Sequence, residues 1–282
     1  MAPFSQRLEP PPNPGRFTLG WVEALPRRNL IRVHANEMQV VRLSSMINAI
    51  SSLISPSGGV LWHVHAFRNR KHWNHFLFPV SNWLEEWRPD SNGLLLIGPS
   101  AGWCLQDSFL GRFSNIHALD IDPLAGKIFR VLHRRLITEG RVELSWQVGN
   151  AFIDLEQLLW KYHSHAILFC NLLGQHGLHQ PVAGLVARDF DKLKSLLRRR
   201  IWASFHDRLS GYWSSTLPIP GQFSLAKAMD TQALANRVGG ECTWTDHLTE
   251  GILPQGNPRL MIPWRIRPEM LHWIEAGYGA VD

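Results

Sequence analysis

The chain has 282 residues, of which 45% are hydrophobic, and a formal net charge of +6. This length is enough to bury one sizeable core and too short for more than two modest domains. Thirteen tryptophans need large buried or half-buried sites, which excludes a largely disordered chain. The basic charge permits contact with nucleic acid, anionic membranes or acidic metabolites, but it selects none of them.

The cysteines are few and far apart, at Cys104, Cys170 and Cys242. This sparse, odd count is typical of a reducing cytoplasm and argues against a disulfide or zinc framework. The proline-rich N-terminus lacks the apolar centre of a signal peptide, and no apolar run approaches the ~20 residues of a membrane-spanning helix. We therefore expect a soluble, cytoplasmic protein that does not bind membranes.

The first third of the chain has the weakest pattern. Residues 1–16 are proline-rich and predict a disordered or extended tail. Residues 17–90 predict an N-terminal extension or cap. Within it, the alternation in GVLWHVHA (59–66) predicts a strand, and the pattern over 76–87 predicts a helix that ends before Pro89.

The middle of the chain alternates between short apolar runs and helical periods. Strands are predicted at 93–98, 116–120, 142–148, 165–170 and 201–206. Helices are predicted from the GPSAG turn to about residue 113, from Pro123 onward with Asp122 as N-cap, over 155–162 and over 190–201. This alternation predicts parallel βαβ units with helices on both faces of the sheet.

The C-terminal part predicts a helix over 225–238 and two strands over 241–253 and 260–266. Two strands without a helix between them indicate an antiparallel hairpin. The predicted fold of residues 91–282 is therefore a three-layer, doubly wound α/β domain. Its sheet would be seven-stranded and mostly parallel, with the hairpin at its C-terminal end.

A glycine turn and a distant acid form the strongest chemical pattern. Gly98 permits a sharp turn at the end of the first parallel strand, and Gly102 permits close approach of the following segment to the sheet. Asp120 comes 22 residues after Gly98 and ends the next strand. An acid at this spacing accepts hydrogen bonds from ribose hydroxyls in dinucleotide-binding folds.

The segments LLLIGPSAG, HALDIDPLAGKIFRVLHRR, VELSWQVGNAF and HAILFCNLLGQHG resemble the successive motifs of class I S-adenosylmethionine-dependent methyltransferases over roughly residues 93–212. The resemblance implies S-adenosylmethionine as the cofactor and methyl transfer as the reaction. It places Gly98, Ser100 and Gly102 under the methionine part, Asp120 on the ribose, Asn150 at the adenine amino group, and Asn171 beside the methyl group. The sequence departs from the family pattern at Leu96, Ser100 and Asn150, where the family has an acid, a glycine and an aspartate.

Methyl transfer needs alignment of the acceptor, and for some acceptors a base. His206 and Asp207, at the end of the fifth strand, are the preferred catalytic candidates, and His176 and His179 are others. We expect a small-molecule acceptor, with RNA as a further possibility. The N-terminal extension is expected to cover the site and select the substrate.

Two other functions remain open. Gly98 to Gly102 also satisfies G-x-S-x-G, so Ser100 with Asp207 and His247 predicts a serine hydrolase as one alternative. The other is a non-catalytic scaffold that binds a partner through its tryptophan-rich extension.

Metal binding is the weaker interpretation of the N-terminal histidines. His63 with His65, and His72 with His75, are spaced closely enough to hold zinc, but a histidine- and tryptophan-rich surface explains them better, so no metal site is predicted. The nearby tryptophans are expected to form core or a lid over the cofactor, and are Trp62, Trp73, Trp83 and Trp87.

Overall fold

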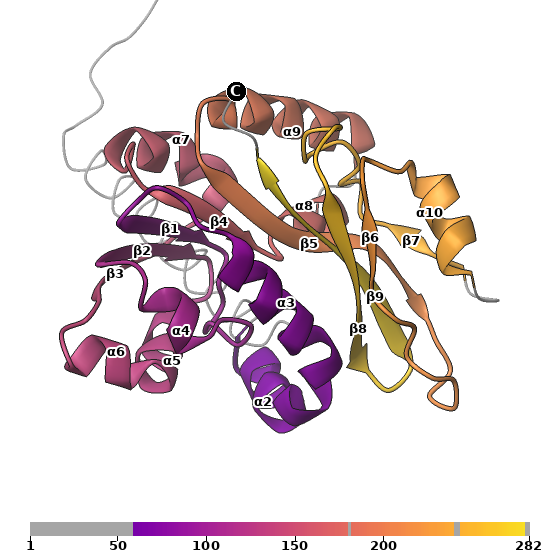
Figure 1. Cartoon of the computed structure of the whole chain (residues 1–282), viewed down its shortest axis with the longest axis horizontal. Coiled ribbons are helices and arrows are strands. Elements are labelled where there is room, and N and C mark those ends of the chain that lie inside the picture. The colour runs from indigo at the N-terminus through magenta and orange to yellow at the C-terminus, as the bar shows by residue number, and fades with distance from the viewer. Residues whose placement is uncertain (1–58, 180–181, 240–242, 280–282) are drawn as a thin grey trace, which may run out of the picture. The chain divides into compact units, whose positions relative to one another are not determined.

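The computed structural model describes residues 59–179, 182–239 and 243–279 (Figure 1). The strands of this part form one nine-stranded sheet, and not the predicted seven-stranded one, in the order β3-β2-β1-β4-β5-β9-β8-β6, and β7 pairs with β5. The bounds of the parallel strands are β1 (Gly93–Ile97), β2 (Asn115–Asp120), β3 (Glu143–Val148), β4 (Ala166–Cys170) and β5 (Trp202–Tyr212).

The parallel half agrees with the sequence prediction. Every residue of β1 and of β4 is buried, which explains why both are continuous apolar runs. The strand order reverses between β1 and β4, which pair in parallel. Ligands of open α/β sheets bind at such a reversal, outside the carboxyl ends of the strands.

The antiparallel half confirms the predicted hairpin but corrects its members. β8 (Arg259–Arg267) pairs with β9 (Met270–Gly279), and β9 pairs with β5. The prediction of a strand over 241–253 was wrong, since within the described residues 243–253 the only strand is β7 (Thr245–Asp246). The prediction of a helix from residue 225 was also wrong, because β6 (Phe223–Leu225) precedes a shorter helix, α10 (Thr231–Val238), whose first turn Asp230 caps.

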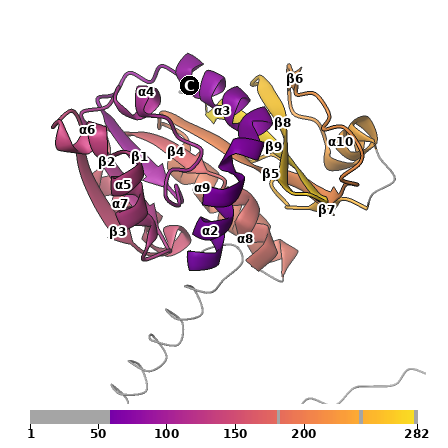
Figure 2. The ribbon, with the colours of Figure 1, turned by 90° about the horizontal axis from the view of Figure 1, so that it is seen from below.

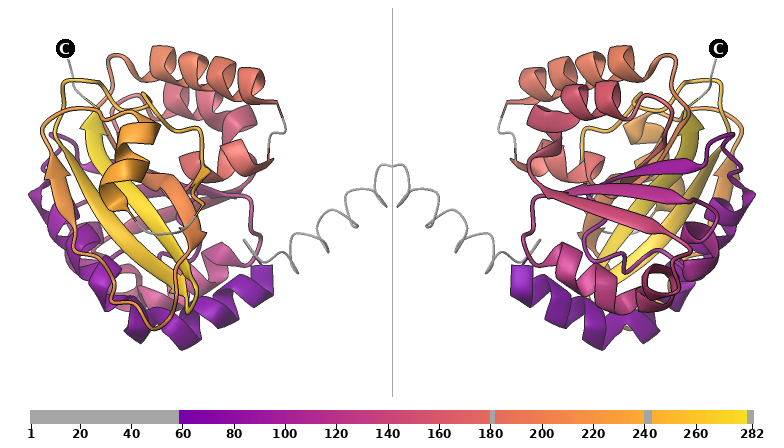
Figure 3. Two further views of the ribbon diagram at one scale, coloured as in Figure 1. Left: turned by 90° about the vertical axis from the view of Figure 1, so that its right-hand side faces the viewer. Right: turned by 90° about the vertical axis from the view of Figure 1, so that its left-hand side faces the viewer.

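Helices cover both faces of the sheet, so the predicted three-layer architecture is confirmed (Figure 3). One layer consists of α7 (Ala151–Lys161), α8 (Leu173–His179) and α9 (Ala183–Leu197). The other layer consists of α2 (Gly59–Asn69), η1 (Arg70–Trp73), α3 (Asn74–Glu86), α4 (Asp107–Leu110), α5 (Ala125–Leu132) and α6 (Arg134–Thr138). Figure 2 shows α2 and α3 lying in front of the sheet.

Two local predictions were wrong for identifiable reasons. Residues 59–66 form helix α2 and not a strand, because the buried positions Gly59, His63 and Ala66 follow a helical period. The helix predicted after the GPSAG turn is reduced to α4. The intervening loop contains left-handed residues at Ser100 (φ 51°) and Gly102 (φ 71°), which a helix does not accept.

Residues 59–90, the described part of the predicted extension, contribute to the core of the sheet. Trp73, Phe76 and Trp83 are almost fully buried within the same hydrophobic cluster as β1 and β4. Trp83 stacks on Tyr278 of β9 with 5.1 Å between ring centroids. Most of these tryptophans are therefore core residues. The predicted tail, residues 1–16, and residues 17–58 of the predicted extension lie outside the described residues.

Two further features bear on the sequence expectations. Cys104 and Cys170 are free thiols, and burial raises the pKa of the Cys104 thiol to about 12. Cys242 lies outside the described residues. In the part of the chain that the structure describes, no helix has the length and apolarity that crossing a membrane requires.

Candidate functional site

The predicted cofactor residues follow the carboxyl ends of neighbouring parallel strands. Gly98 and Ser100 follow β1, Asp120 ends β2, Asn150 follows β3 and Asn171 follows β4. Since these strands are adjacent and parallel, their carboxyl ends lie at one edge of the sheet. The fold thus brings residues separated by more than 70 positions to the same edge.

The loop after β1 is bonded to the end of β2. The backbone N–H of Ser100 donates to Asp120 Oδ2 at 2.6 Å, and the N–H of Gly98 donates to the carbonyl of Leu119 at 2.8 Å. Gly98 has a φ of 66°, a left-handed conformation that favours glycine. The glycine turn and the acid singled out in the sequence therefore form one unit.

Asp120 is a buried carboxylate that accepts from backbone N–H groups and lies near the Asp122 carboxylate and the His63 imidazole. Its side chain is 7% exposed, and Oδ1 accepts a further hydrogen bond from the N–H of Asp122. Burial raises the pKa of Asp120 to about 6, since the two backbone N–H groups only partly offset the desolvation of the charge. Such a carboxylate still has unused lone pairs for hydroxyl donors.

The start of α2 is attached to the same edge. Asp122 accepts from the N–H of Gly59 at 2.7 Å and from the N–H of Leu124 at 2.8 Å. His63 Nε2 lies 3.0 Å from Asp122 Oδ2, and the His63 Nδ1 faces Trp103 Nε1 at 3.1 Å. Asp122 thus caps the turn before α5, near the position predicted for it, and also holds α2 in place.

Trp62 is the α2 residue that reaches the glycine loop. Its Nε1–H donates to Ser100 Oγ at 3.0 Å. The ring stacks on Trp73 at 5.8 Å and meets Trp264 edge-on at 6.3 Å. This contact places an aromatic side chain directly against the residue that replaces the family's middle glycine.

The remaining predicted cofactor residues already have protein partners. Asn150 Oδ1 accepts from the N–H of Phe152 at 3.0 Å and so caps α7. Asn171 Oδ1 accepts from the N–H of Asp207 at 3.0 Å. A Cβ at Gly102 would lie 2.6 to 2.8 Å from His133 and Phe129, so this glycine is required by protein packing.

A second polar cluster lies beyond the end of β4. Asp207 and His247 are fully buried, and His272 is largely buried. Asp207 Oδ1 lies 2.7 Å from His272 Nδ1. His247 Nε2 lies 2.9 Å from Ser210 Oγ, and its Nδ1 lies 2.9 Å from the carbonyl oxygen of Gly174 at the start of α8.

A β-bulge in β5 assembles this cluster. The pairing of β5 with β9 slips by one residue between Asp207 and Leu209, so that Ser210 pairs with His272. In a regular strand, residues three apart face opposite sides, but the extra residue restores Asp207 and Ser210 to one face. Sequence reasoning found Asp207 and His247. It missed Ser210 and His272, although the apolar run of β9 was a visible strand signal.

The other histidine candidates lie elsewhere. His206, adjacent to Asp207 on β5, points to the opposite face, where Nδ1 meets Ser204 Oγ at 2.9 Å and Nε2 lies 3.4 Å from Glu275. His176 pairs with Asp189 at 3.0 Å. The side chain of His179 lies outside the described residues. The structure does not bring His206 and Asp207 together as a pair.

The groups required for a serine hydrolase are not connected in the described structure. The recorded partner of Ser100 Oγ is Trp62, whereas His247 is bonded to Ser210 and Asp207 to His272. A hydrolytic serine needs a hydrogen-bonded base. This geometry gives no support to the hydrolase alternative.

The histidines considered for zinc are held by protein groups. His65 Nε2 lies 2.8 Å from the carbonyl of Ile266, and His75 accepts from the N–H of Arg265 at 3.0 Å. Among the described residues, none of the N-terminal histidines joins a group of three metal-ligating side chains. The interpretation of this segment as ordinary surface and core fits these contacts.

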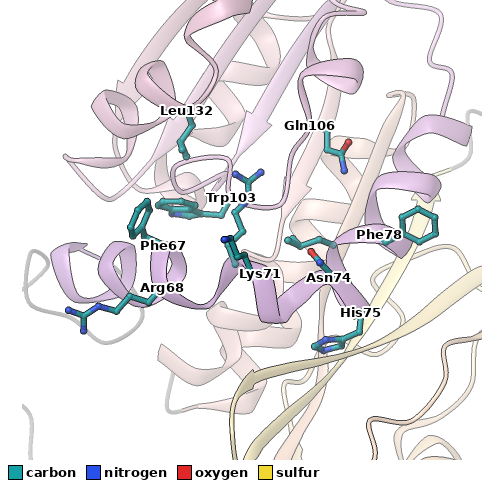
Figure 4. A pocket seen from close by; sticks show the side chains of 11 residues that line it. Phe67, Arg68, Lys71, Asn74, His75, Phe78, Trp103, Gln106 and Leu132 are labelled. Atoms are coloured by element: carbon teal, nitrogen blue, oxygen red, sulfur yellow. The ribbon is translucent and has the colours of Figure 1, made fainter.

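A groove of about 1200 Å³ lies between α2, η1 and α3 on one side and the loop after β1 on the other (Figure 4). Its walls include the basic side chains of Arg68, Arg70 and Lys71, and the exposed rings of Phe67 and Phe78. None of the predicted cofactor residues lines it. The groove is therefore a separate surface from the carboxyl edge of the sheet.

No protein-family model and no curated protein matches the chain. Among solved structures it is similar to the N-methyltransferase NodS from Bradyrhizobium japonicum WM9 in complex with S-adenosyl-L-homocysteine, with a TM-score of 0.39 and 12% identity over 82% of this chain and 96% of that chain. A S-adenosylmethionine-dependent methyltransferase from Clostridium acetobutylicum ATCC 824 has a TM-score of 0.32 and 10% identity over 76% and 75%. A putative Zn-dependent alcohol dehydrogenase from Rhodobacter sphaeroides has a TM-score of 0.34 and 14% identity over 54% and 56%.

These likenesses are too distant to establish a cofactor or an activity, so the fit of S-adenosylmethionine depends on the residues of the edge. Asp120 suits the ribose in type, in place and in its unused acceptor capacity. The exposed Asn150 keeps its side-chain N–H groups and a second lone pair for adenine. The residues at the nucleoside end therefore fit the cofactor. At the other end, the Ser100 hydroxyl already accepts a hydrogen bond from Trp62.

Proposed function

We propose that this chain transfers a methyl group from S-adenosylmethionine to a small-molecule acceptor. The observation that carries the proposal is the bond between the loop after β1 and the buried Asp120 at the end of β2. It joins a left-handed glycine loop to an acceptor for ribose at the reversal of the strand order, where ligands of open α/β sheets bind.

The chain's own residues would bind and orient the cofactor. Asp120 accepts from the ribose hydroxyls, and the backbone of Gly98 to Ser100 lies under the methionine part. Asn150 contacts the adenine amino group. When bound, S-adenosylmethionine supplies a methyl group already activated by its sulfonium, so the protein's task is mainly alignment.

The acceptor would approach from the end of β4 and β5. Asn171 ends β4, and its side chain is hydrogen-bonded to the backbone of Asp207. Asp207 and His272, 2.7 Å apart, are the groups placed to take up a proton at this end. Because Asp207 is fully buried and His272 largely so, a small acceptor fits this position better than a large one such as RNA.

A non-catalytic scaffold is the second candidate, and one contact favours it. Trp62 donates to Ser100 Oγ at the place where the cofactor's methionine part would lie. A chain that had lost cofactor binding would keep such a contact as permanent packing. The scaffold predicts that cofactor binds only when Trp62 is removed, or does not bind at all.

Calorimetric titration with S-adenosylhomocysteine separates these candidates. The methyltransferase proposal expects saturable binding by the wild type and a loss of affinity of roughly 100-fold or more in Asp120→Ala. The reason is that two hydrogen bonds to a charged group are worth about 1.5–3 kcal/mol each. Asp191→Ala is the matched control, because Asp191 is an exposed acid on α9 that pairs with Lys194, away from this edge.

Three outcomes decide between the functions. Binding that Asp120→Ala loses and Asp191→Ala keeps supports the cofactor site. Binding by Trp62→Ala but not by the wild type supports the scaffold, with Trp62 as a permanent plug. No binding by either protein would exclude S-adenosylmethionine as the cofactor.

A further inference from the structure

The cluster around Asp207, in the middle of β5, contains three side chains of the types that ligate metals. Asp207, His247 and His272 each place one ligand atom so that all three atoms lie within 4.8 Å of one another. They come from β5, the segment after β7, and β9. Among the described residues, no other group of three or more His, Cys, Asp or Glu side chains brings its ligand atoms this close together.

The outer contacts of the cluster are those that a metal site requires. His247 Nδ1 lies 2.9 Å from the carbonyl oxygen of Gly174, which fixes the proton on Nδ1, and the Nε2 lone pair, which a metal would take, faces the Ser210 hydroxyl at 2.9 Å. Asp207 Oδ2 accepts from Gln175 Nε2 at 3.1 Å. Metal-ligating histidines almost always donate their other N–H to a carbonyl or carboxylate, and ligating carboxylates are hydrogen-bonded in turn.

The charge of the cluster also calls for a cation. Asp207 is fully buried, and no lysine or arginine pairs with it in the described part of the chain. A buried carboxylate without a positive partner is strongly unfavourable. A metal ion held jointly by the three side chains would supply the positive charge that Asp207 lacks.

The dimensions allow the metal. Ligand atoms at about 2.1 Å from Zn²⁺ in tetrahedral geometry lie about 3.4 Å apart. Side-chain rotations that move each ligand atom by roughly 1 Å are thus sufficient to bring the three atoms to this spacing around an ion. His272 is 12% exposed and provides a way in from solvent.

We propose that Asp207, His247 and His272 bind one divalent transition metal ion of the class that prefers imidazole and carboxylate ligands, such as Zn²⁺ or Fe²⁺. Three protein ligands leave at least one coordination position open, which is typical of catalytic and not of structural metal sites. The proposal uses none of the residues assigned to the nucleoside, but it takes Asp207 and His272 as ligands, so a bound metal would replace their role as proton acceptors.

The test is a titration of the untagged, chelator-treated full chain with Co²⁺, followed by its visible d–d absorption. We expect one Co²⁺ per chain, with bands that Zn²⁺ abolishes by displacing it. Substitution of a residue that hydrogen-bonds to a ligand costs roughly 10–100-fold in metal affinity, so Gln175→Ala should cost about 10-fold. His272→Ala removes a ligand itself and should cost at least about 100-fold.

His176→Ala is the matched control. His176 pairs with an aspartate at 3.0 Å and is also 12% exposed, but its pair lacks a third ligand. This variant should bind Co²⁺ as the wild type does. Circular dichroism establishes whether His272→Ala is folded, and Gln175→Ala, which keeps all three ligands, tests the site if it is not.

Several results would overturn the proposal. These are the absence of saturable Co²⁺ binding by the wild type, unchanged affinity in a folded His272→Ala or in Gln175→Ala, and loss of binding in His176→Ala. In each case the cluster would be a buried Asp207–His272 ion pair and no metal site.

Discussion

Two aspartates, Asp120 at the end of β2 and Asp207 in the middle of β5, are buried to nearly the same degree but have opposite electrostatics. Asp120 is 7% exposed and accepts only backbone N–H groups, and burial raises its pKa to about 6. Asp207 is fully buried. Burial alone would raise its pKa too, but the neighbouring imidazoles of His272 and His247 outweigh burial and lower it.

The difference shows that the partners of a buried carboxylate decide its chemistry more than its burial does. The hydrogen bonds to Asp120 come from neutral backbone donors, and in the proposed function a neutral hydroxyl donor from ribose would join them. Asp207 is surrounded by imidazoles, and a cation or a proton completes that one. The four predictions below test this contrast, beginning with the largest expected effect.

Removal of the Asp207 carboxylate should have the largest effect on stability. Asp207→Ala should lower the free energy of unfolding by about 3–5 kcal/mol, because it breaks a buried pair and leaves His272 and Gln175 without their acceptor. Urea denaturation measures this. Asp189→Ala, which removes the more exposed partner of His176, should cost about 1 kcal/mol or less. Equal losses in both variants would contradict the contrast.

The pH dependence of stability tests Asp120. Its folded-state pKa is raised, so its contribution is fully present below its unfolded pKa near 4 and is lost as pH rises through about 6. Relative to Asp120→Asn, the wild type should lose about 3 kcal/mol between pH 4 and pH 7, from about 1.4 kcal/mol per pKa unit. Denaturation of both proteins across this range measures the difference, and parallel curves would show that Asp120 has an ordinary pKa.

The glycine loop that holds Asp120 can be tested with a matched pair of glycines. Gly102 and Gly140 have φ angles of 71° and 67°, but a Cβ on Gly102 would meet Phe129 and His133 whereas one on Gly140 meets nothing within 4 Å. Gly102→Ala should therefore cost about 2 kcal/mol more than Gly140→Ala. Thermal or urea unfolding measures the loss of stability in both variants. Equal losses would mean that the loop at Gly102 shifts to accept the added Cβ without a cost in stability.

The smallest expected effect concerns Trp62. Trp62→Phe keeps an aromatic ring against Trp73 but removes the donor to Ser100 Oγ, so it should cost about 1 kcal/mol. Ser100→Ala should have a similar cost, and the double variant should cost less than the sum of the two. Additive losses in this double-mutant cycle would show that the hydrogen bond contributes nothing.

The sequence predicted the parallel half of the fold and singled out the glycine turn and Asp120, which the structure joins by a hydrogen bond. Buried parallel strands are continuous apolar runs, as in β1 and β4, and they can be recognised locally. The glycine turn before Asp120 is likewise a local signal, because only certain residues adopt left-handed conformations. No local pattern indicated that Trp62 would lie against Ser100, a contact across 38 positions.

By itself, then, the sequence determined the alternation of strands and helices, the reversal of strand order that follows from it, and the acid at the end of β2. The tertiary structure decided which residues surround Asp207. His272 joins it because β9 pairs with β5, and Ser210 joins it because one extra residue in β5 shifts that pairing. Pairing register and bulges depend on contacts between segments more than 60 residues apart, which no local pattern of side chains encodes.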